Sequence, residues 1–429
     1  MNIRLAIATL SLAVTPFASA TAAIFCATNE TELRAALGTI GSTFSSENNE
    51  LRLTRRVFFT GTQTFATQVS GPSGNLVVSG GWSALGGAPT ACDVQQNDAR
   101  LTVIDAQGTS AVLSITRNSI SGNATPLIAV SNLTLRNGNA ASAPVGLYVT
   151  NSFGSIEVDN IIVHGHRATA SQYLGGVAIT LDASTKDIRL RNSLIYDNQG
   201  AFIAGGPPLA NVLFTSLSLN ANRNWYASNN TIFAGPDSSA EALRIQSDGN
   251  FWVINNVVRG TVSYAGSITG AGSATQPQLR QLFNNFSALP DTGSTVLVSN
   301  LSNGTANPMI DPVTFFPQPG SPLINGGLGS PPGGTALLDV YGQSRVSNTV
   351  VDIGAVEYQG VPNLPPCTLD VDGNGSVNPL TDGLMIVRAM FGLTGTAVTS
   401  GALAGNSARN TWALVRAYLN GSCGANFAP

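Results

Sequence analysis

A motif built around one asparagine recurs five times in the middle of the chain, and it constrains the fold more than any other feature. In each copy an apolar residue stands two positions before the asparagine and another stands three positions after it. The asparagines are Asn132, Asn160, Asn192, Asn229 and Asn255, separated by 28, 32, 37 and 26 residues. An irregular period of this size is typical of a solenoid in which each repeat forms one coil with loops of variable length.

Stacked coils would place these asparagines above one another. We expect an internal ladder in which each amide bonds to its neighbours, because an unsatisfied buried amide costs about 1–3 kcal/mol. The 46 glycines and 22 prolines also favour a turn-rich β architecture over long helices. The alternative is an antiparallel sandwich, which would show hairpin turns roughly every 8–12 residues instead of a repeated strand-turn-strand frame.

The repeated frame resembles the right-handed, single-stranded parallel β-helix of the pectate-lyase-like architecture. This resemblance implies an all-β body whose first coil needs a cover against exposed core and free strand edges. The segment from Asn29 to Leu37 has the pattern of a short amphipathic helix, with Asn29 and Glu32 placed as a capping box. We therefore expect an N-terminal helical cap.

The first 23 residues have the pattern of a secretory signal peptide. Arg4 precedes an apolar run from Leu5 to Phe17, which is too short to span a bilayer and is followed by small residues. We predict cleavage after Ala20 or Ala23, with a retained N-terminal anchor as the alternative. After cleavage we expect no transmembrane segment and a secreted, extracellular or cell-surface location.

Export makes disulfides the expected state of the four cysteines. Four cysteines allow three connectivities, which the sequence does not separate, but the spacing favours Cys26–Cys92 and Cys367–Cys423.

Charged residues make up only 10% of the chain and the formal net charge is −3, so there is no basic footprint for nucleic acid. We expect a monomer with a polysaccharide or surface-protein partner.

Near the C-terminus, oxygen-bearing side chains alternate around Gly375. They are Asp370, Asp372, Asn374, Ser376 and Asn378, and Asp382 follows. Ca²⁺ prefers six to eight oxygen ligands, and such side chains converge only if the backbone turns sharply, as glycine permits. The pattern predicts one structural Ca²⁺; an ordinary Asp-Gly turn is the alternative.

Three blocks after the repeats resemble the end of the bacterial choice-of-anchor Q family. They are Ser321–Gly327, Asp339–Arg345 and Val351–Tyr358. The resemblance covers roughly residues 24–360 and implies an exported β-helical protein whose C-terminal attachment module varies between members. One departure is Asn325, where the family usually has Asp, so this position has an amide in place of an acid.

Beyond a Pro-rich linker at 361–366, residues 367–429 resemble a dockerin module with its EF-hand-like loop and helix. The resemblance assigns side-chain ligation to Asp370, Asp372 and Asn374, the carbonyl to Ser376, and direct or water-mediated ligation to Asn378. The acid expected at loop position twelve is displaced by one residue, to Asp382. A second helix at 411–419 follows a loop without an acidic ligand, so the resemblance implies a single Ca²⁺ in this module.

The sequence does not decide whether the body is an enzyme, and it favours a non-catalytic role. No carboxylate pair of the polysaccharide-hydrolase type is present. A uronate lyase would need an Arg or Lys base near acidic residues. The candidates are Lys186, Asp187, Arg189, Arg191 and Asp197, and the alternative is a patch of exposed ion pairs.

The residue four positions after each motif asparagine is expected to point outward. That column is Arg136, His164, Tyr196, Phe233 and Arg259, a stripe of planar groups suited to binding sugars or uronate carboxylates. His164 and His166 alternate on the same strand, so we expect a solvent-facing pair rather than a metal site.

Three functions compete on these observations. The leading one is an exported, carbohydrate-associated binding or scaffold protein with a calcium-stabilised, dockerin-like attachment module. The alternatives are a polysaccharide-degrading enzyme, as a uronate lyase before a glycoside hydrolase, and an adhesin-like structural protein.

Overall fold

The computed structural model describes residues 23–42, 48–70, 74–119, 125–141, 144–152, 154–168, 179–183, 186–199, 210–215, 223–234, 241–246, 249–264, 278–290, 296–347, 350–359, 368–405, 407–423, 425 and 427. Residues 1–22 of the expected signal peptide, Cys367 and the linker at 361–366 lie outside them. The chain divides into two compact units, Met1–Glu357 and Tyr358–Pro429.

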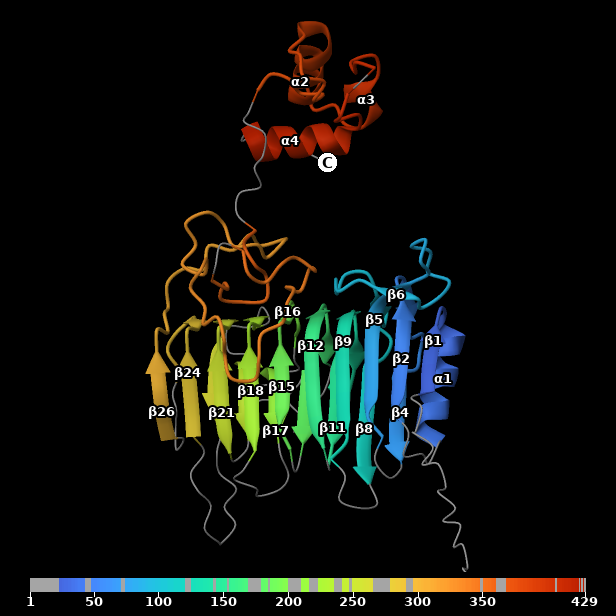
Figure 1. Ribbon diagram of the computed structural model, residues 1–429, viewed down its shortest axis with the longest axis vertical. Helices are drawn as coiled ribbons and strands as arrows, with labels where there is room; N and C mark the ends of the chain where they lie inside the picture. The colour runs from blue at the N-terminus through green and yellow to red at the C-terminus, as the bar shows by residue number, and fades with distance from the viewer. Residues whose placement is uncertain are drawn as a thin grey trace, which may run out of the picture. The chain divides into compact units, whose positions relative to one another are not determined.

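The first unit is an all-β fold of parallel strands (Figure 1). The larger sheet contains β1 (Ala23–Ala27), β2 (Asn49–Thr54), β3 (Val57–Phe59), β5 (Leu76–Ser83), β6 (Val94–Gln95), β7 (Val103–Asp105), β9 (Leu127–Arg136), β12 (Ser155–His164), β15 (Ile188–Arg191), β16 (Leu194–Tyr196), β18 (Asn224–Ser228), β19 (Thr231–Phe233), β21 (Asn250–Ile254), β22 (Val257–Arg259), β24 (Gln278–Leu282), β25 (Asn285–Phe286) and β26 (Val296–Leu301). Its strands pair in parallel except for β6, which is antiparallel to β5.

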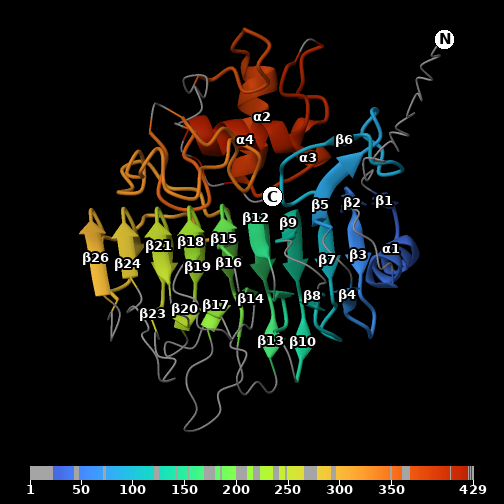
Figure 2. The same ribbon diagram turned by 60° about the horizontal axis from the view of Figure 1, so that its bottom comes forward.

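Two further sheets complete this unit (Figure 2). One contains β4 (Phe65–Ser70), β8 (Leu113–Ser119), β11 (Leu147–Asn151), β14 (Ile179–Ala183), β17 (Ala210–Thr215), β20 (Glu241–Gln246) and β23 (Thr261–Tyr264). The other is the short parallel pair β10 (Asn139–Ala140) and β13 (Arg167–Ala168).

The register of the larger sheet follows the motif spacing. The residue that precedes each motif asparagine pairs with the equivalent residue of the following repeat. These residues are Ser131, Asp159, Arg191, Ser228 and Ile254. These steps are 28, 32, 37 and 26 residues, the same as the separations between the asparagines. The sequence prediction of stacked, in-register copies is therefore confirmed.

The five motif asparagines all have the left-handed backbone conformation, with φ between 53° and 57°. Asparagine adopts this conformation more readily than other residues with a side chain, because its short polar group bonds locally. Asn192, Asn229 and Asn255 make sharp turns between β15 and β16, β18 and β19, and β21 and β22, whereas Asn132 and Asn160 bend the strands β9 and β12 from within. The motif specifies a backbone turn.

Asn132, Asn160 and Asn192 bond to one another as predicted, whereas from Asn230 onward the internal amide ladder is built by the residue after the motif position. Asn230 Nδ2 donates to Asn256 Oδ1 (3.0 Å), Asn256 Nδ2 to Asn284 Oδ1 (3.0 Å), and Asn284 Nδ2 to Asn303 Oδ1 (2.8 Å). The first three of these residues are at most 1% exposed. The prediction that Asn229 and Asn255 belong to the ladder is wrong, because their left-handed turns direct the amides to the carbonyls of Asp352 and Leu328.

Columns of apolar side chains fill the space between the sheets. In the larger sheet one column runs through Leu51, Val78, Val130, Val158 and Leu190, each at most 1% exposed. Burying one such side chain contributes about 1.5–3 kcal/mol relative to leaving it in water. This column fixes the strand faces, because a one-residue slip would turn every apolar side chain outward.

Helix α1 (Glu30–Ser42) packs against the first strands and buries Leu33, Leu37 and Ile40. Asn29 Oδ1 accepts the Glu32 N–H at 2.9 Å, as the capping box requires. The Glu32 carboxylate accepts from the Thr28 N–H at 2.7 Å, so the return bond is shifted one residue from the expected Asn29.

Residues 308–347 and 350–357, which we name the cover segment, lie against the turns at the ends of the strands (Figure 2). The blocks Ser321–Gly327, Asp339–Arg345 and Val351–Tyr358 are bonded to one another inside it. Glu357 N–H donates to Asp339 Oδ2 (3.0 Å), Asp352 N–H to Glu357 Oε2 (2.9 Å), and Asn325 N–H to Asp352 Oδ1 (2.7 Å). The Arg345 guanidinium, fully buried, lies 3.7 Å from Glu357.

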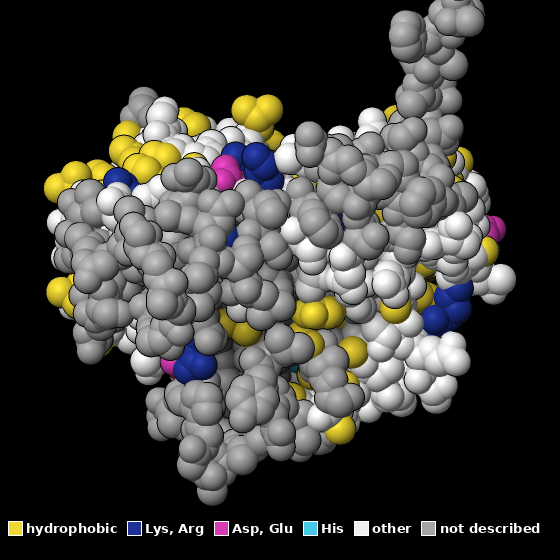
Figure 3. All heavy atoms as spheres, turned by 90° about the horizontal axis from the view of Figure 1, so that it is seen from below, with side chains coloured by type: hydrophobic (Ala, Val, Ile, Leu, Met, Phe, Trp, Pro, Cys, Tyr) yellow, Lys and Arg dark blue, Asp and Glu magenta, His cyan; other side chains and the backbone are white. Residues whose placement is uncertain are grey.

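The predicted Cys26–Cys92 disulfide is present. Cys423 is also disulfide-bonded, while its expected partner Cys367 lies outside the described residues. No helix in the described part of the chain is both long and apolar enough to cross a membrane. Among the described side chains visible in Figure 3, only a few are charged.

The second unit contains a π-helical turn (Pro379–Gly383), α2 (Leu384–Met390), α3 (Thr396–Thr399) and α4 (Trp412–Cys423). Val371, Met385, Val398, Val415 and Leu419 form its buried core. Gly392, which has a φ of 78°, follows α2.

Candidate functional site

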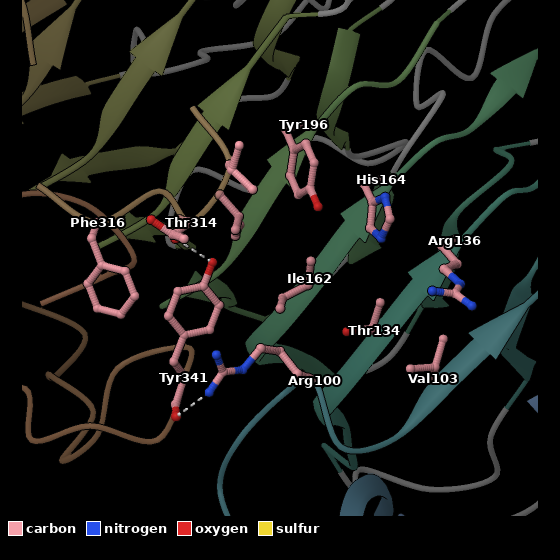
Figure 4. Close-up of a pocket in the computed structure, with 12 residues that line it drawn as sticks. Arg100, Val103, Thr134, Arg136, Ile162, His164, Tyr196, Thr314, Phe316 and Tyr341 are labelled. Atoms are coloured by element: carbon pink, nitrogen blue, oxygen red, sulfur yellow. Dashed lines mark hydrogen bonds between the residues drawn. The ribbon is translucent and has the colours of Figure 1, made fainter. Parts of the chain in front are cut away.

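A cavity of about 320 Å³ lies between the larger sheet and the cover segment (Figure 4). We name it the aromatic cavity. Its sheet side consists of Val103, Thr134, Arg136, Ile162, His164, Leu194 and Tyr196, and the rest of its lining consists of Arg100, Val313, Thr314, Phe316 and Tyr341.

Strand register brings the sheet-side residues together. His164 pairs in parallel with Arg136 on one side and with Tyr196 on the other. The imidazole and phenol rings stack with centroids 4.9 Å apart and planes 3° from parallel. Neighbouring strands lie roughly 4.8 Å apart, so the stacking follows directly from the register.

The cover segment supplies the opposite wall. The Tyr341 hydroxyl donates to the Thr314 carbonyl at 2.9 Å, which fixes the ring beside the cavity (Figure 4). Phe316 packs against Tyr341 with ring centroids 5.4 Å apart. Burial raises the pKa of Tyr341, so its hydroxyl stays protonated at neutral pH.

Two guanidinium groups face the cavity, and each is held from behind by a buried carboxylate. Arg100 bonds Asp98 at 2.8 Å and lies 4.3 Å from the centroid of the Tyr341 ring. Arg136 bonds Asp105 at 2.8 Å. The side chains of Arg100 and Arg136 are 52% and 36% exposed, against 9% and 7% for the two aspartates, so the cationic ends remain open to a ligand.

Histidine 164 is neutral in this setting. Burial, and then the nearby Arg136 charge, lower the pKa of His164 below its usual value. A neutral imidazole offers one donor and one acceptor. The cavity thus combines guanidinium donors, an imidazole and phenol rings, which suits a ligand with a carboxylate and hydroxyl groups.

The predicted planar stripe is in register but is not an open surface. Tyr196 and Phe233 both pack against Phe315 of the cover segment, with centroids 4.5 and 5.7 Å away. Arg259 donates to the Phe286 carbonyl at 2.7 Å, which occupies part of its guanidinium. The prediction of an exposed stripe is therefore wrong, since sequence periodicity does not reveal that a distant segment folds over the turns.

The prediction of two solvent-facing histidines is also wrong. Strand β12 ends at His164, and Gly165 has a φ of 71°, so the chain turns before His166. His166 is fully buried, and its Nδ1 accepts the Gly138 N–H at 2.9 Å.

The five lyase candidates are not assembled into one site. Arg189 lies 3.7 Å from Asp187 and also bonds Glu157, whereas Asp197 follows β16 and bonds Arg167 at 3.3 Å. Lys186 is exposed.

Arg191, the remaining candidate, bonds Asp159 at 2.9 Å and the Gly333 carbonyl at 2.9 Å. None of the five candidates lines the aromatic cavity. Among the described residues four of them form ion pairs, in agreement with the alternative of an ion-pair patch, and Lys186 is not part of these pairs.

Sequence reasoning missed Arg100, Thr314, Phe316 and Tyr341 as site residues. Tyr341 lies inside the Asp339–Arg345 block, and the resemblance of that block to a known family could have marked it as a candidate. Arg100 carries no such signal, because its position beside Tyr341 depends on a contact across 241 residues of sequence.

In the second unit, carboxylate oxygens of Asp370, Asp372 and Asp382 lie within 4.8 Å of one another. The displaced acid Asp382, rather than Thr381, joins the group. The π-helical turn that contains it explains this, because a π turn accommodates one more residue than an α turn.

Backbone N–H groups hold the three carboxylates in place. Asp370 accepts from Gly373, Asn374 and Gly375 (2.9–3.1 Å), and Asp382 accepts from Val371 and Asp372 (2.6 and 3.0 Å). Asp370 Oδ2 and Asp372 Oδ1 each accept a single hydrogen bond, so each keeps a lone pair for a cation, whereas both Asp382 oxygens already accept two. A group of close carboxylates of this kind suits a hard ion with oxygen ligands.

Two of the predicted ligands point elsewhere. Asn378 Oδ1 accepts the Leu380 N–H at 2.9 Å as a helix cap, and Asn374 Oδ1 accepts the Ser376 N–H at 2.7 Å. Arg409, from the loop without acids, donates to the Val371 carbonyl at 2.7 Å and places a positive charge beside the three aspartates.

Comparisons of the chain with protein-family models, with curated proteins and with solved structures give no match.

Proposed function

We propose that this chain is an exported, parallel β-helical protein that binds acidic polysaccharide in the aromatic cavity. The observation that carries the proposal is the pair of guanidinium groups, Arg100 and Arg136, open at the cavity while their aspartate partners are buried behind them. A uronate unit has a carboxylate for the guanidinium donors and ring hydroxyls for His164 and Tyr196. The proposed role is binding, because the part of the cavity lining that the structure describes has guanidinium, imidazole and phenol groups and no carboxylate.

The β-helical part of the proposal rests on repeated parallel pairing. Strands of the seven-stranded sheet follow in chain order from β4 to β23, and strands of the larger sheet pair at the motif spacing. This arrangement supports a right-handed β-helix with α1 as its N-terminal cap, and it fits the resemblance to the choice-of-anchor Q family.

For the second unit we propose a dockerin-like attachment module that holds one Ca²⁺. Asp370, Asp372 and Asp382 would bind the ion, which would offset the mutual repulsion of three close carboxylates. Arg409 supports the single-ion proposal, since its guanidinium supplies positive charge from the second loop.

Binding to acidic oligosaccharides tests the proposal. We expect the full chain to bind oligogalacturonates more tightly than neutral oligosaccharides of equal length in calorimetry. Arg100→Gln or Arg136→Gln should weaken binding about tenfold or more, because each removes a charge-assisted hydrogen bond.

Lys186→Gln is the matched control, since it removes the same charge from an exposed residue outside the cavity. Equal affinity of wild type, both arginine variants and the control would refute the proposed site.

A further inference from the structure

A second cavity of about 330 Å³ lies along the same strands at their left-handed turns. Its polar lining includes Asn97, Asn132, Asp159, Asn160 and Asn192. We name it the amide cavity. It shares no lining residue with the aromatic cavity.

The four asparagines form a directed chain of hydrogen bonds. Asn192 Nδ2 donates to Asn160 Oδ1 (3.2 Å), Asn160 donates to Asn132 Oδ1, and Asn132 Nδ2 donates to Asn97 Oδ1 (3.0 Å). The chain begins at the buried guanidinium of Arg345, which donates to Asn192 Oδ1. A cation at one end polarises the amides in a single direction, so their N–H groups become stronger donors.

Some side-chain N–H groups of the hydrogen-bonded asparagines remain available to a ligand in the cavity. Among the described contacts, Asn132 and Asn160 each use one side-chain N–H bond, while an amide carries two N–H groups. Acceptor capacity is present as well. Asp159 Oδ2 bonds Arg191 at 2.9 Å, but its buried Oδ1 has no hydrogen-bond partner in the described part of the structure.

An apolar edge completes the cavity. Ala336, Leu337 and Leu338 line it, and Leu337 is 90% exposed. Leu337 thus offers an apolar contact surface at the edge of an otherwise polar cavity.

We propose that the amide cavity binds one neutral sugar unit. A pyranose presents adjacent hydroxyls, one of which would donate to Asp159 Oδ1 while another accepts from the free N–H groups of Asn132 and Asn160. Its apolar C–H face would contact Leu337. The volume lies at the small end of ligand pockets, which suits a single ring.

A bound cation is the competing occupant, and the geometry disfavours it. The amide oxygens of Asn132, Asn160 and Asn192 already accept N–H groups, and the guanidinium of Arg191 neutralises Asp159. The inference rests on the proposed function only in that the ligand is a glycan, and it adds a neutral subsite to the acidic one.

Calorimetry of the full chain with methyl glycosides of neutral hexoses and pentoses tests this inference. We expect binding that Asp159→Asn weakens about tenfold or more, because the unpartnered acceptor loses its charge. Leu337→Ser should also weaken it without lowering the melting temperature, since that residue supports no packing. Leu289→Ser, at a residue 57% exposed outside both cavities, is the matched control.

Three results would overturn the inference. One is no neutral-sugar binding by the wild type, and another is binding unchanged in both cavity variants. The third is a calcium-dependent rise in melting temperature that Asp159→Asn abolishes, which would assign the cavity to a cation. Arg100→Gln separates the two sites, because it should weaken oligogalacturonate binding and leave neutral-sugar binding intact.

Discussion

Acidification should destabilise the first unit through His166. This side chain is 0% exposed, its Nδ1 accepts the Gly138 N–H at 2.9 Å, and its backbone N–H donates to Asn198 Oδ1 at 3.1 Å. Protonation of Nδ1 would break the bond to Gly138 and leave a charge in the core. Burial, and then the ionisable neighbour His164 and the positive charge of Arg167, lower the pKa of His166 from 6.5 to about 3.

The direction and size of this pH effect on the free energy of unfolding follow from the difference between the folded and unfolded pKa of His166. Because the folded pKa is below the unfolded one, the unfolded chain takes up this proton first as the pH falls. The contribution of neutral His166 to the free energy of unfolding is fully present above pH 6.5 and decreases until the pH falls to about 3. Each pH unit within this window costs about 1.4 kcal/mol, so acidification from about pH 6.5 to about pH 4.5 should cost about 3 kcal/mol.

Urea unfolding of the full chain at about pH 7 and about pH 4.5 measures this loss. His166→Asn retains an acceptor for Gly138 but does not titrate, so the variant should lose about 3 kcal/mol less than wild type over that interval. His164→Asn is the control, because the half-buried ring of His164 can be protonated at a lower cost in free energy than the buried ring of His166. If wild type and His166→Asn lose equal stability, buried His166 is not the acid-sensitive group and the reasoning is refuted.

Three further outcomes are expected. Calcium should raise the melting temperature of the second unit, and Asp370→Ala with Asp372→Ala should abolish the rise; a wild-type melt identical in chelator and in millimolar calcium would exclude the ion. Arg345→Met should lower the free energy of unfolding by about 3–5 kcal/mol, because it leaves buried carboxylates without their cation, and a loss below about 1 kcal/mol in urea would contradict the buried pair. Gly154→Ala should destabilise by about 1–3 kcal/mol, since a Cβ there would stand 1.7 Å from the Pro126 carbonyl oxygen, whereas Gly86→Ala, with nothing within 4 Å, should change the unfolding midpoint little.

The sequence alone predicted the parallel strands and their register, because Asn132 and its equivalents recur where the backbone must turn left-handed. It misplaced the amide ladder by one residue at Asn229 and Asn255. An asparagine that makes a left-handed turn and an asparagine that faces inward look alike in a sequence, and only the turn geometry separates them. The next residue, as in Asn230 and Asn256, carries the ladder.

The binding sites were less accessible to prediction. Arg136, His164 and Tyr196 were found from the repeat, since strand register is a local property repeated along the chain. Their cavity was not, because its other wall comes from Tyr341 and Arg100, which reach it through contacts that no periodic pattern encodes.

The cover segment also changes how the strand array can unfold. In a stack of repeats each unit contacts only its neighbours, so the ends can fray one repeat at a time. Here Arg345 bonds Asn192 and the Asn229 carbonyl, while Ala355 N–H donates to Thr231 and Gly354 N–H to the Asn255 carbonyl. One segment is thus fastened to three successive turns, which couples their opening. These strands should exchange their amide hydrogens together, as a single cooperative unit, rather than in order from the nearest end.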